Sequence, residues 1–372
     1  MYRTEQVLYT VAENKEKAEI RQEENGKDRI MFQSVFENRG NWYKGNLHMH
    51  TTRSDGRLHP RDAVEIYRKS GYDFIALTDH RRPSVMIEPG ERRDPDDWDK
   101  GAGQTAHEMT SSVSKAATEN EDGIVDAGRM LILSGVEWDT GGANTKAPGD
   151  VLTYHILGIG MTSNQGLNYR ENPHPAPQEI VDAIRADGGI AILAHPAWSV
   201  MDPKGILNLN GITAAEIYNS VSDLPFNGQR ADSSAWFDIW GTNYDRLIPA
   251  VASDDAHGYE GDQCCSYTMV NAAELSRDGI LDALQAGNFY ASQKPVIHEM
   301  AIDWERGIVH LEFSEDVMTV VFYSNHIWVP QRVTQVKGGR MDYQIAPGEF
   351  FVRAELITRD GRKAWTSPVR VD

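Results

Sequence analysis

The sequence predicts an α/β domain followed by a small all-β region, and three observations lead to this fold class. From about residue 42, short apolar runs alternate with helical patterns, which favours a parallel sheet of βα units, either open or closed as a barrel. After about residue 294 the helical patterns stop and short alternating strands follow. The 372 residues, 40% hydrophobic and 25% charged, suffice for one large and one smaller globular core.

The strands of the α/β region are expected where short apolar runs end at turn residues. The predicted strands are Gly45–His50, Phe74–Thr78, Met130–Glu137, Leu152–Ile159, Ile190–His195, Ala214–Tyr218 and Ile248–Ser253. Amphipathic patterns, each followed closely by glycine, predict helices between some of them. The predicted helices are Pro60–Ser70, Pro177–Asp187 and Ala273–Ala286.

The domain organisation follows from these patterns. Residues 1–41 are polar and are expected to form an N-terminal extension, with a helix-compatible stretch at Glu13–Asn25. Residues 42–294 form the predicted α/β domain, interrupted by a long polar insertion at 81–123 of the kind that is usually functional. Residues 295–372 form a predicted β-sandwich-like domain, with strands at Val309–Phe313, Thr319–Ser324, Gly348–Thr358 and Lys363–Val369.

Charge and cysteine content exclude several classes of protein. With 37 Lys and Arg against 55 Asp and Glu, the net charge is −18, which argues against a protein that coats long nucleic acids. The two cysteines, Cys264 and Cys265, are adjacent and are not expected to form a structural disulfide. No targeting or membrane-spanning segment is expected, so the predicted location is cytoplasmic.

Histidines and carboxylates collect near the ends of the predicted strands, where active sites of α/β proteins assemble. His48 and His50 are two residues apart on one extended segment, so both imidazoles face the same side and can reach one ion. A single histidine of this kind is more often an ordinary core or surface residue. Here, however, several predicted strands in succession end near residues of the types that bind metal ions. The remaining candidates are Asp55, His80, Glu137, His155, His195, Asp255 and His257.

These nine candidates are too many for one tetrahedral ion. Mixed imidazole and carboxylate ligation suits Zn, Mn or Fe, with carboxylates bridging the ions of a cluster, so two to three divalent ions are expected. Asp79 and Asp254 are candidates for orienting ligand imidazoles. A glycine-rich phosphate loop of the P-loop kind is missing from the sequence, which disfavours nucleoside-triphosphate motor chemistry.

The motifs resemble those of the polymerase-and-histidinol-phosphatase (PHP) superfamily of metal-dependent hydrolases over roughly residues 42–293. They are Asn46-Leu-His-Met-His-Thr-Thr-Arg-Ser-Asp-Gly and Ala76-Leu-Thr-Asp-His, followed by Gly-Val-Glu-Trp, Ala-His-Pro and Asp-Ala-His. The resemblance implies a distorted, TIM-like barrel of seven β/α units holding up to three ions. It assigns one ion to His48, His50, Glu137 and Asp255, a second to Glu137, His155 and His195, and a third to Asp55, His80 and His257.

A second resemblance is to the carbaryl-hydrolase-like branch of that superfamily. It rests on Tyr-Lys-Gly-Asn-Leu-His at Tyr43–His48 and on the β-rich tail after Phe289-Tyr-Ala-Ser. The chain departs from the branch at Ser292-Gln-Lys-Pro, where the branch often has Gly-Pro. Members of the branch include phosphoesterases and enzymes that cleave carboxylic or carbamic esters, so the resemblance implies hydrolysis of an ester.

The expected function is that of a metal-dependent hydrolase, most simply a phosphoesterase that acts on a small phosphorylated substrate through metal-bound hydroxide. The candidate catalytic residues are Glu137, as the bridging carboxylate, with Asp255 and His257. Three alternatives stay open: a carboxyl or carbamate ester hydrolase, a nuclease of short oligonucleotides, and a non-catalytic metal-binding accessory module. The candidate substrate contacts are Arg53 and Arg81, which could grip a phosphate, and His107 in the long insertion.

Overall fold

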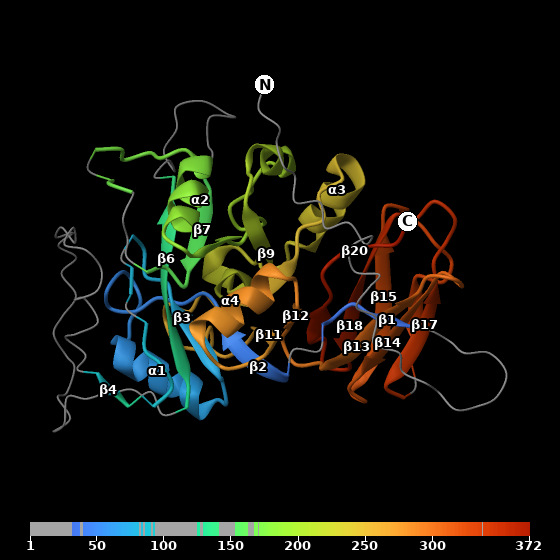
Figure 1. Cartoon of the computed structure of the whole chain (residues 1–372), viewed down its shortest axis with the longest axis horizontal. Helices are drawn as coiled ribbons and strands as arrows, with labels where there is room; N and C mark the ends of the chain where they lie inside the picture. Colours follow the sequence, from blue (N-terminus) through green and yellow to red (C-terminus); the bar gives the residue numbers. More distant parts are fainter. Residues whose placement is uncertain are drawn as a thin grey trace.

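The computed structural model (Figure 1) describes most of the chain from residue 32 onward. The helix predicted at Glu13–Asn25, His107 and most of the insertion at 81–123 lie outside the described residues. The described residues are 32–37, 40–81, 83–84, 86–90, 92–93, 125–126, 129–140, 153–162, 167–169, 171–336 and 338–372.

The α/β part contains every strand predicted for it, with boundaries that differ by a few residues. Its strands are β2 (Asn41–Asn46), β3 (Phe74–Leu77), β6 (Leu131–Asp139), β7 (His155–Ile159), β8 (Ile190–Leu193), β9 (Ile212–Asn219), β10 (Ala250–Ser253), β11 (Tyr267–Ala272) and β12 (Phe289–Ser292). Two further short strands, β4 (Arg92–Arg93) and β5 (Val125–Asp126), pair with each other. Neither β11 nor β12 was predicted.

The sheet is mixed rather than parallel. Its order is β10-β9-β8-β7-β6-β3-β2-β11-β12, and β7 runs antiparallel to both β6 and β8. A parallel neighbour requires a crossover connection, usually a helix, whereas antiparallel neighbours such as β6 and β7 do not. The strand ladder between the two ends of this path is not closed: among the described residues, the segments after β2 and β10 are joined by the isolated bridge Met49–Ala256 and not by paired strands. A closed barrel of seven β/α units is therefore not observed.

Alternating residues of the central strands pack on opposite faces of the sheet. Ile75 and Leu77 pack in a cluster with helix α1 (Pro60–Lys69), whereas Phe74 and Ala76 pack in another cluster with α4 (Arg277–Gln285). Helix α2 (Pro177–Ala186) packs with β7 and β8, and Figure 1 shows α4 in front of β2 and β11. The two faces are thus both covered, which leaves the strand ends as the place where polar side chains converge.

Two of the predicted helices are confirmed with nearly the expected bounds, and the third starts later than predicted. Helix α4 begins at Arg277 rather than Ala273, because the Ser276 hydroxyl accepts a hydrogen bond from the backbone of Gly279 and caps the helix there. Helix α3 (Ser234–Tyr244) was not predicted, since its large apolar residues do not form a clear stripe. Short 3-10 turns lie at η3 (Pro203–Asn208), η4 (Val221–Asp223) and η5 (Pro225–Asn227).

The predicted all-β tail is confirmed and consists of two sheets around one core. One sheet has the order β1-β13-β14-β17, and the other continues the large sheet as β12-β19-β18-β15-β16, with β20 beside β18. Phe322 from one sheet and Leu311 from the other pack in the same cluster. The bounds are β1 (Gln33–Ser34), β13 (Ile297–Asp303), β14 (Ile308–Phe313), β15 (Val317–Ser324), β16 (Val333–Gln335), β17 (Arg340–Gln344), β18 (Phe351–Thr358), β19 (Lys363–Trp365) and β20 (Val369–Arg370).

The tail is joined to the α/β part by hydrogen bonds and by buried charge. Strand β12 pairs with β19, and the fully buried Arg353 of β18 donates to both carboxylate oxygens of Asp238 in α3. From the N-terminal region, β1 pairs with β13 and so joins the tail sheet. The domain boundaries at residues 41 and 294 stay predictions.

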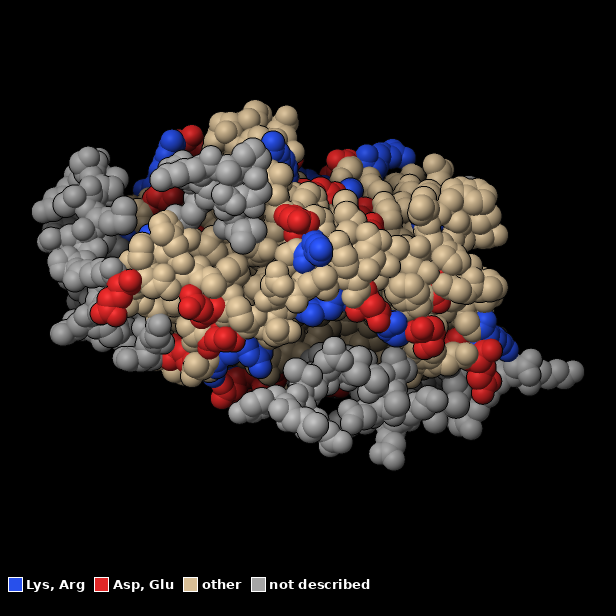
Figure 2. All heavy atoms as spheres, turned by 90° about the horizontal axis from the view of Figure 1, so that it is seen from above, with Lys and Arg blue, Asp and Glu red and all other residues tan. Residues whose placement is uncertain are grey.

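The surface carries both signs of charge. On the face in Figure 2, Lys and Arg are scattered among Asp and Glu over the described residues, without a continuous basic stripe. Among the described residues, no helix is both long and apolar enough to cross a membrane.

Candidate metal centre

The nine candidate ligands come from six strand ends and gather at one edge of the sheet. His48 and His50 follow β2, which ends earlier than predicted, at Asn46. His80 follows β3 and forms a bridge with Glu137 of β6. His155 is the first residue of β7 rather than a residue near its end, and the antiparallel direction of β7 brings it to the edge where Glu137 lies. The others lie in the segments after their strands: Asp55 after β2, His195 after β8, and Asp255 and His257 after β10.

The first ligand group contains His48, His50, Glu137 and Asp255, as the PHP resemblance implies. The two Nε2 atoms of the histidines lie 3.2 Å apart. Asp255 Oδ1 lies 3.1 Å from His48 Nε2 and 2.9 Å from His50 Nε2, and Glu137 Oε2 lies 3.2 and 3.1 Å from the same atoms. The four side chains are buried, so these donor atoms face one another away from solvent.

The second group contains Glu137, His155 and His195. Glu137 Oε1 lies 2.7 Å from His155 Nδ1 and 3.2 Å from His195 Nε2. The other oxygen of Glu137 faces the first group, so one carboxylate borders both groups. This is the arrangement expected of a bridging carboxylate.

The third group contains Asp55, His80 and His257, and the structure adds His50 to it. The nearest ring nitrogens of His50, His80 and His257 lie 3.6, 3.6 and 3.4 Å from the carboxylate of Asp55. His80 Nδ1 also lies 3.1 Å from Glu137 Oε2. The Asp55 side chain is 57% exposed, whereas the Glu137 side chain is 1% exposed, so this group lies at the rim of the centre.

The side chains of the first group fit a divalent cation. Glu137 Oε2 and Asp255 Oδ1 are buried and have no hydrogen-bond partner among the described residues, although histidine nitrogens lie about 3 Å away. Ligands at about 2.0–2.1 Å from a tetrahedral ion are separated from one another by about 3.3 Å, close to the separations seen here. We infer that the group is shaped around a shared cation.

The electrostatics of the centre likewise favour positive charge. Burial alone would lower the pKa of His48 and His50, but the carboxylates of Asp255 and Glu137 raise the pKa of His48 well above its usual value and that of His50 to about 10. Burial raises the pKa of Glu137 and Asp255, and the neighbouring histidines overcome this and lower the pKa of both carboxyls below the usual range. Protons therefore supply, without a metal, the positive charge that divalent ions would supply.

At the rim, His80 behaves in the opposite way. Burial and the neighbouring charge of His50 lower the pKa of His80 to about 4, against the raising effect of Glu137. The pKa of Asp55 is lowered despite partial burial, because the imidazoles of His257, His50 and His80 surround it. The rim group thus pairs a carboxylate with a histidine that stays neutral near pH 7.

Asp79 and Asp254 contact the loops that carry the ligands rather than the ligand imidazoles. Asp79 accepts hydrogen bonds from the backbone and hydroxyl of Thr51 and from the hydroxyl of Ser54. Asp254 accepts from the Tyr67 hydroxyl and from three consecutive backbone N–H groups, those of residues 264–266. Burial raises the pKa of Asp254 to about 6, although these donors lower it.

Sequence reasoning missed Glu216, which lies in β9 and is fully buried. Its Oε1 lies 2.9 Å from His48 Nδ1, and its donor atoms group with those of His48 and His195. A single carboxylate inside the apolar run of Ala214–Tyr218 was the available signal, because a buried charge requires partners.

The candidate substrate contacts are placed only in part. Arg81 follows His80, and its guanidinium pairs with Asp139 and lies 4.2 Å from the centre of the Tyr169 ring. Arg53 is half-buried in the segment between His50 and Asp55. His107 lies outside the described residues, and the role of all three stays a prediction.

Aromatic side chains border the second group. The Trp198 ring lies 4.9 Å from the ring of His195 and 5.7 Å from that of His155, measured between centroids. The Trp198 indole N–H donates to Asn227 Oδ1 at 2.7 Å, which holds the ring beside these histidines.

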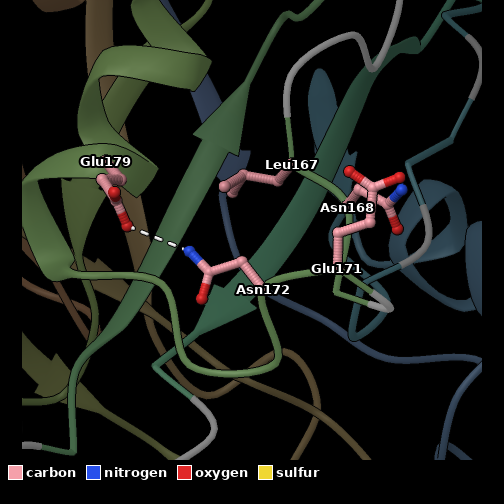
Figure 3. Close-up of a pocket in the computed structure, with 5 residues that line it drawn as sticks. All are labelled: Leu167, Asn168, Glu171, Asn172 and Glu179. Carbon is pink, nitrogen blue, oxygen red and sulfur yellow. Dashed lines mark hydrogen bonds between the residues drawn. The ribbon is translucent and has the colours of Figure 1, made fainter.

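A pocket of about 280 Å³ contains none of the nine candidate ligands and is lined by Leu167, Asn168, Glu171, Asn172 and Glu179 (Figure 3). Glu179 accepts hydrogen bonds from the side chain of Asn172 and from the backbone of Ala176, at the start of α2. Its carboxylate is thus occupied in holding the start of this helix.

No protein-family model matches the chain. Among curated proteins, the 5′-3′ exoribonuclease of Haemophilus influenzae is 27% identical over 249 residues, which cover 57% of this chain and 89% of that protein. The DNA polymerase/3′-5′ exonuclease PolX of Bacillus subtilis is 51% identical over 37 residues, which cover 10% of this chain and 6% of that protein.

Three solved structures are similar to the chain. One is a two-domain protein from Bacteroides vulgatus containing a predicted PHP-like metal-dependent phosphoesterase (TM-score 0.45, 16% identity, 93% of this chain and 100% of that chain). The others are an amidohydrolase from Chromobacterium violaceum (TM-score 0.34, 15% identity, 59% and 89%) and a metal-dependent phosphoesterase from Bifidobacterium adolescentis (TM-score 0.33, 16% identity, 57% and 87%). TM-scores this low do not establish a shared fold. None of these descriptions names the carbaryl-hydrolase-like branch.

Proposed function

We propose that the chain is a metal-dependent hydrolase of phosphoesters, acting on a small phosphorylated substrate. The observation that carries the proposal is the position of Glu137, whose two oxygens face three clusters of ligand atoms. A carboxylate shared in this way is the hallmark of a multinuclear centre rather than of one structural ion. The imidazole and carboxylate donors suit two to three divalent ions of Zn, Mn or Fe.

Each proposed ion would be held by its own set of residues. His48, His50 and Asp255 would hold the first with Glu137, His155 and His195 the second, and Asp55, His80 and His257 the third. Bound divalent ions lower the pKa of water and polarise the phosphoryl oxygen, which is the chemistry that ester hydrolysis needs. Glu137 would fix the spacing of the groups, while Trp198 packs beside the histidines of the second group.

Substrate contacts are proposed at the rim. Arg81 is held beside His80 by Asp139, so its position is preset, and a phosphate of the substrate would compete with Asp139 for the guanidinium. Arg53 and His107 remain the other candidates. The proposed partner is a small-molecule ester, and the proposed location is the cytoplasm.

A second candidate function is that of a nuclease acting on short oligonucleotides. Both curated relatives are described as exonucleases, which act on phosphodiesters, and this favours phosphoesters over carboxyl esters. The net charge of −18 and the mixed surface in Figure 2 favour short substrates over long polynucleotides. The carbaryl-hydrolase-like branch, and with it cleavage of carboxyl or carbamate esters, stays a prediction.

The test measures bound metal and then activity of the Mn²⁺- and Zn²⁺-loaded protein on a panel of substrates. The panel holds phosphomonoesters, nucleoside monophosphates, phosphodiesters, short oligonucleotides, and aryl carboxyl and carbamate esters. Turnover of the phosphorylated members is expected. Full metal occupancy without turnover of any phosphorylated member would overturn the phosphoesterase proposal, and turnover of carboxyl esters alone would replace it with the alternative.

A further inference from the structure

Glu216 and Asn219 of β9 connect three of the candidate ligands. We propose that these two residues are positioning residues that preset His48, His195 and Asp255 before an ion binds, and that Glu216 is not itself a metal ligand. The proposal rests on the proposed metal binding but not on the identity of the substrate. Both residues are fully buried, so each polar atom requires a partner inside the protein.

The first contact sets the ring of His48. Glu216 Oε1 lies 2.9 Å from His48 Nδ1 and, as a carboxylate, can only accept, so Nδ1 carries the proton. With that proton fixed, the lone pair of Nε2 faces His50, Glu137 and Asp255, where the first ion would lie. A histidine ligand held by a carboxylate on its other nitrogen is a common way to orient the ring and raise its basicity.

The second set of contacts holds two ligands whose backbones are strained. His195 and Asp255 have φ values of 27° and 54°, in the left-handed region that residues other than glycine rarely adopt. The backbone N–H of His195 donates to Glu216 Oε2 at 2.9 Å, and Asn219 Nδ2 donates to Asp255 Oδ2 at 3.1 Å. Each strained ligand is therefore tied to one member of the Glu216–Asn219 pair.

The pair is itself fixed by further hydrogen bonds. Asn219 Nδ2 also donates to Glu216 Oε2 at 2.9 Å, while the backbone and hydroxyl of Ser222 donate to Asn219 Oδ1. These contacts leave one orientation of the Asn219 amide. Asp255 Oδ2 is then held, and Asp255 Oδ1 faces His48 and His50.

The rival interpretation makes Glu216 a ligand, because its oxygens lie near ligand atoms of His48 and His195. Its two oxygens already accept three hydrogen bonds, one of them from a backbone N–H. Coordination of an ion by these oxygens would leave buried donors without acceptors, which is energetically unfavourable. The geometry therefore favours a positioning role.

Glu216→Gln makes the proposal testable, because glutamine keeps the shape but has only one acceptor oxygen. That oxygen can serve His195 N–H and Asn219, which places the amide NH₂ against His48 Nδ1. His48 must then give up the proton on Nδ1 and keep one on Nε2, where it blocks the first ion. The matched control is Glu349→Gln, a buried glutamate in the tail that accepts from Ser324 and Tyr343.

The experiment uses the full chain with ¹⁵N-labelled histidine and Zn²⁺ alone as the probe. Ring nitrogen spectra of the metal-free protein report whether His48 Nδ1 carries a proton, and calorimetry reports Zn²⁺ affinity. We expect a protonated Nδ1 in the wild type, an unprotonated Nδ1 in Glu216→Gln, and about 10- to 100-fold weaker binding of the first ion in that variant. The Glu349→Gln control should keep the wild-type tautomer and affinity.

Several results would overturn the inference: unchanged protonation of His48 Nδ1 in Glu216→Gln, unchanged Zn²⁺ affinity, or a His48 Nδ1 that binds Zn²⁺ in the wild type. If Glu216→Gln does not fold, Zn²⁺ binding by Asn219→Ser decides: we expect about 10-fold weaker binding, and unchanged affinity would contradict the proposal. A wild type that binds no Zn²⁺ would overturn the proposed function, while protonation of His48 Nδ1 in the metal-free protein would still test the positioning role.

Discussion

The two buried ligand groups and the rim group use the same residue types in different surroundings. In the buried groups, the side chains of His48, His50 and Glu137 are at most 1% exposed. At the rim, Asp55, His80 and His257 are 57%, 27% and 28% exposed. Water screens the rim charges and competes for them, whereas the buried donors have only one another. Burial therefore predicts that ions bind tightly in the first two groups and that the ion in the third group exchanges readily.

The largest effect is expected from Glu137→Gln, because Glu137 faces all three groups. Loss of its charge removes one of the counter-ions of the buried histidines and the bridge between ions. We expect a fall in kcat of at least about 10³-fold, together with loss of metal from both buried groups. Metal analysis and steady-state kinetics measure this, with Glu349→Gln as the control. Retained metal and activity would show that the groups do not depend on a bridge.

The contrast between the groups is sharpest in a pair of matched variants, Asp255→Asn and Asp55→Asn. The buried Asp255 carboxylate should matter more, with about 10²- to 10³-fold weaker metal binding. Loss of the exposed Asp55 carboxylate should weaken metal binding by only about 2- to 5-fold, and only for the last ion to bind. Calorimetric titration with Mn²⁺ separates the steps. Equal losses in the two variants would mean that burial does not rank the sites.

The pH dependence of metal-free stability should also separate the two regions. The pKa of His50 is raised to about 10, so its contribution to stability is complete below pH 6.5 and is lost as pH rises from 6.5 to about 10. The pKa of His80 is lowered to about 4, so its contribution is complete above pH 6.5 and is lost as pH falls towards 4. Stability of the metal-free protein should therefore peak near pH 6.5.

Chemical denaturation across this pH range measures both slopes. His50→Gln should reduce the loss of stability on the alkaline side, and His80→Gln should reduce the loss of stability on the acid side. Saturating Zn²⁺ should remove the loss of stability at alkaline pH, because a bound ion requires neutral His50. An alkaline slope that is unchanged in His50→Gln would contradict the assignment of part of that slope to His50.

The smallest effect is expected at Arg81, which lies at the rim. Because Asp139 already holds its guanidinium, Arg81→Met should raise KM for a phosphorylated substrate by about 2- to 5-fold and leave kcat nearly unchanged. Arg370→Met removes another paired arginine, far along the chain in β20, and serves as the control. A large fall in kcat would instead place Arg81 against the reacting phosphoryl group.

Several features of the fold could not be read from the sequence. The antiparallel direction of β7 could not be predicted, because an apolar run does not encode the direction of its strand in the sheet. Helix α3 lacks an apolar stripe because it packs against both η3 and the tail. Strands β11 and β12 escaped prediction since their boundaries depend on pairing with β2 and β19.

The sequence by itself determined which residues are suited to bind metal, because imidazole and carboxylate side chains stand out in apolar strands. It also predicted the succession of an α/β part and a β tail, since periodicity reflects burial. Only the tertiary structure decided that Glu137 faces three groups, that His50 borders two, and that Glu216 holds His48. Those relations join residues far apart in the chain, and they depend on strand order and direction, which local patterns do not specify.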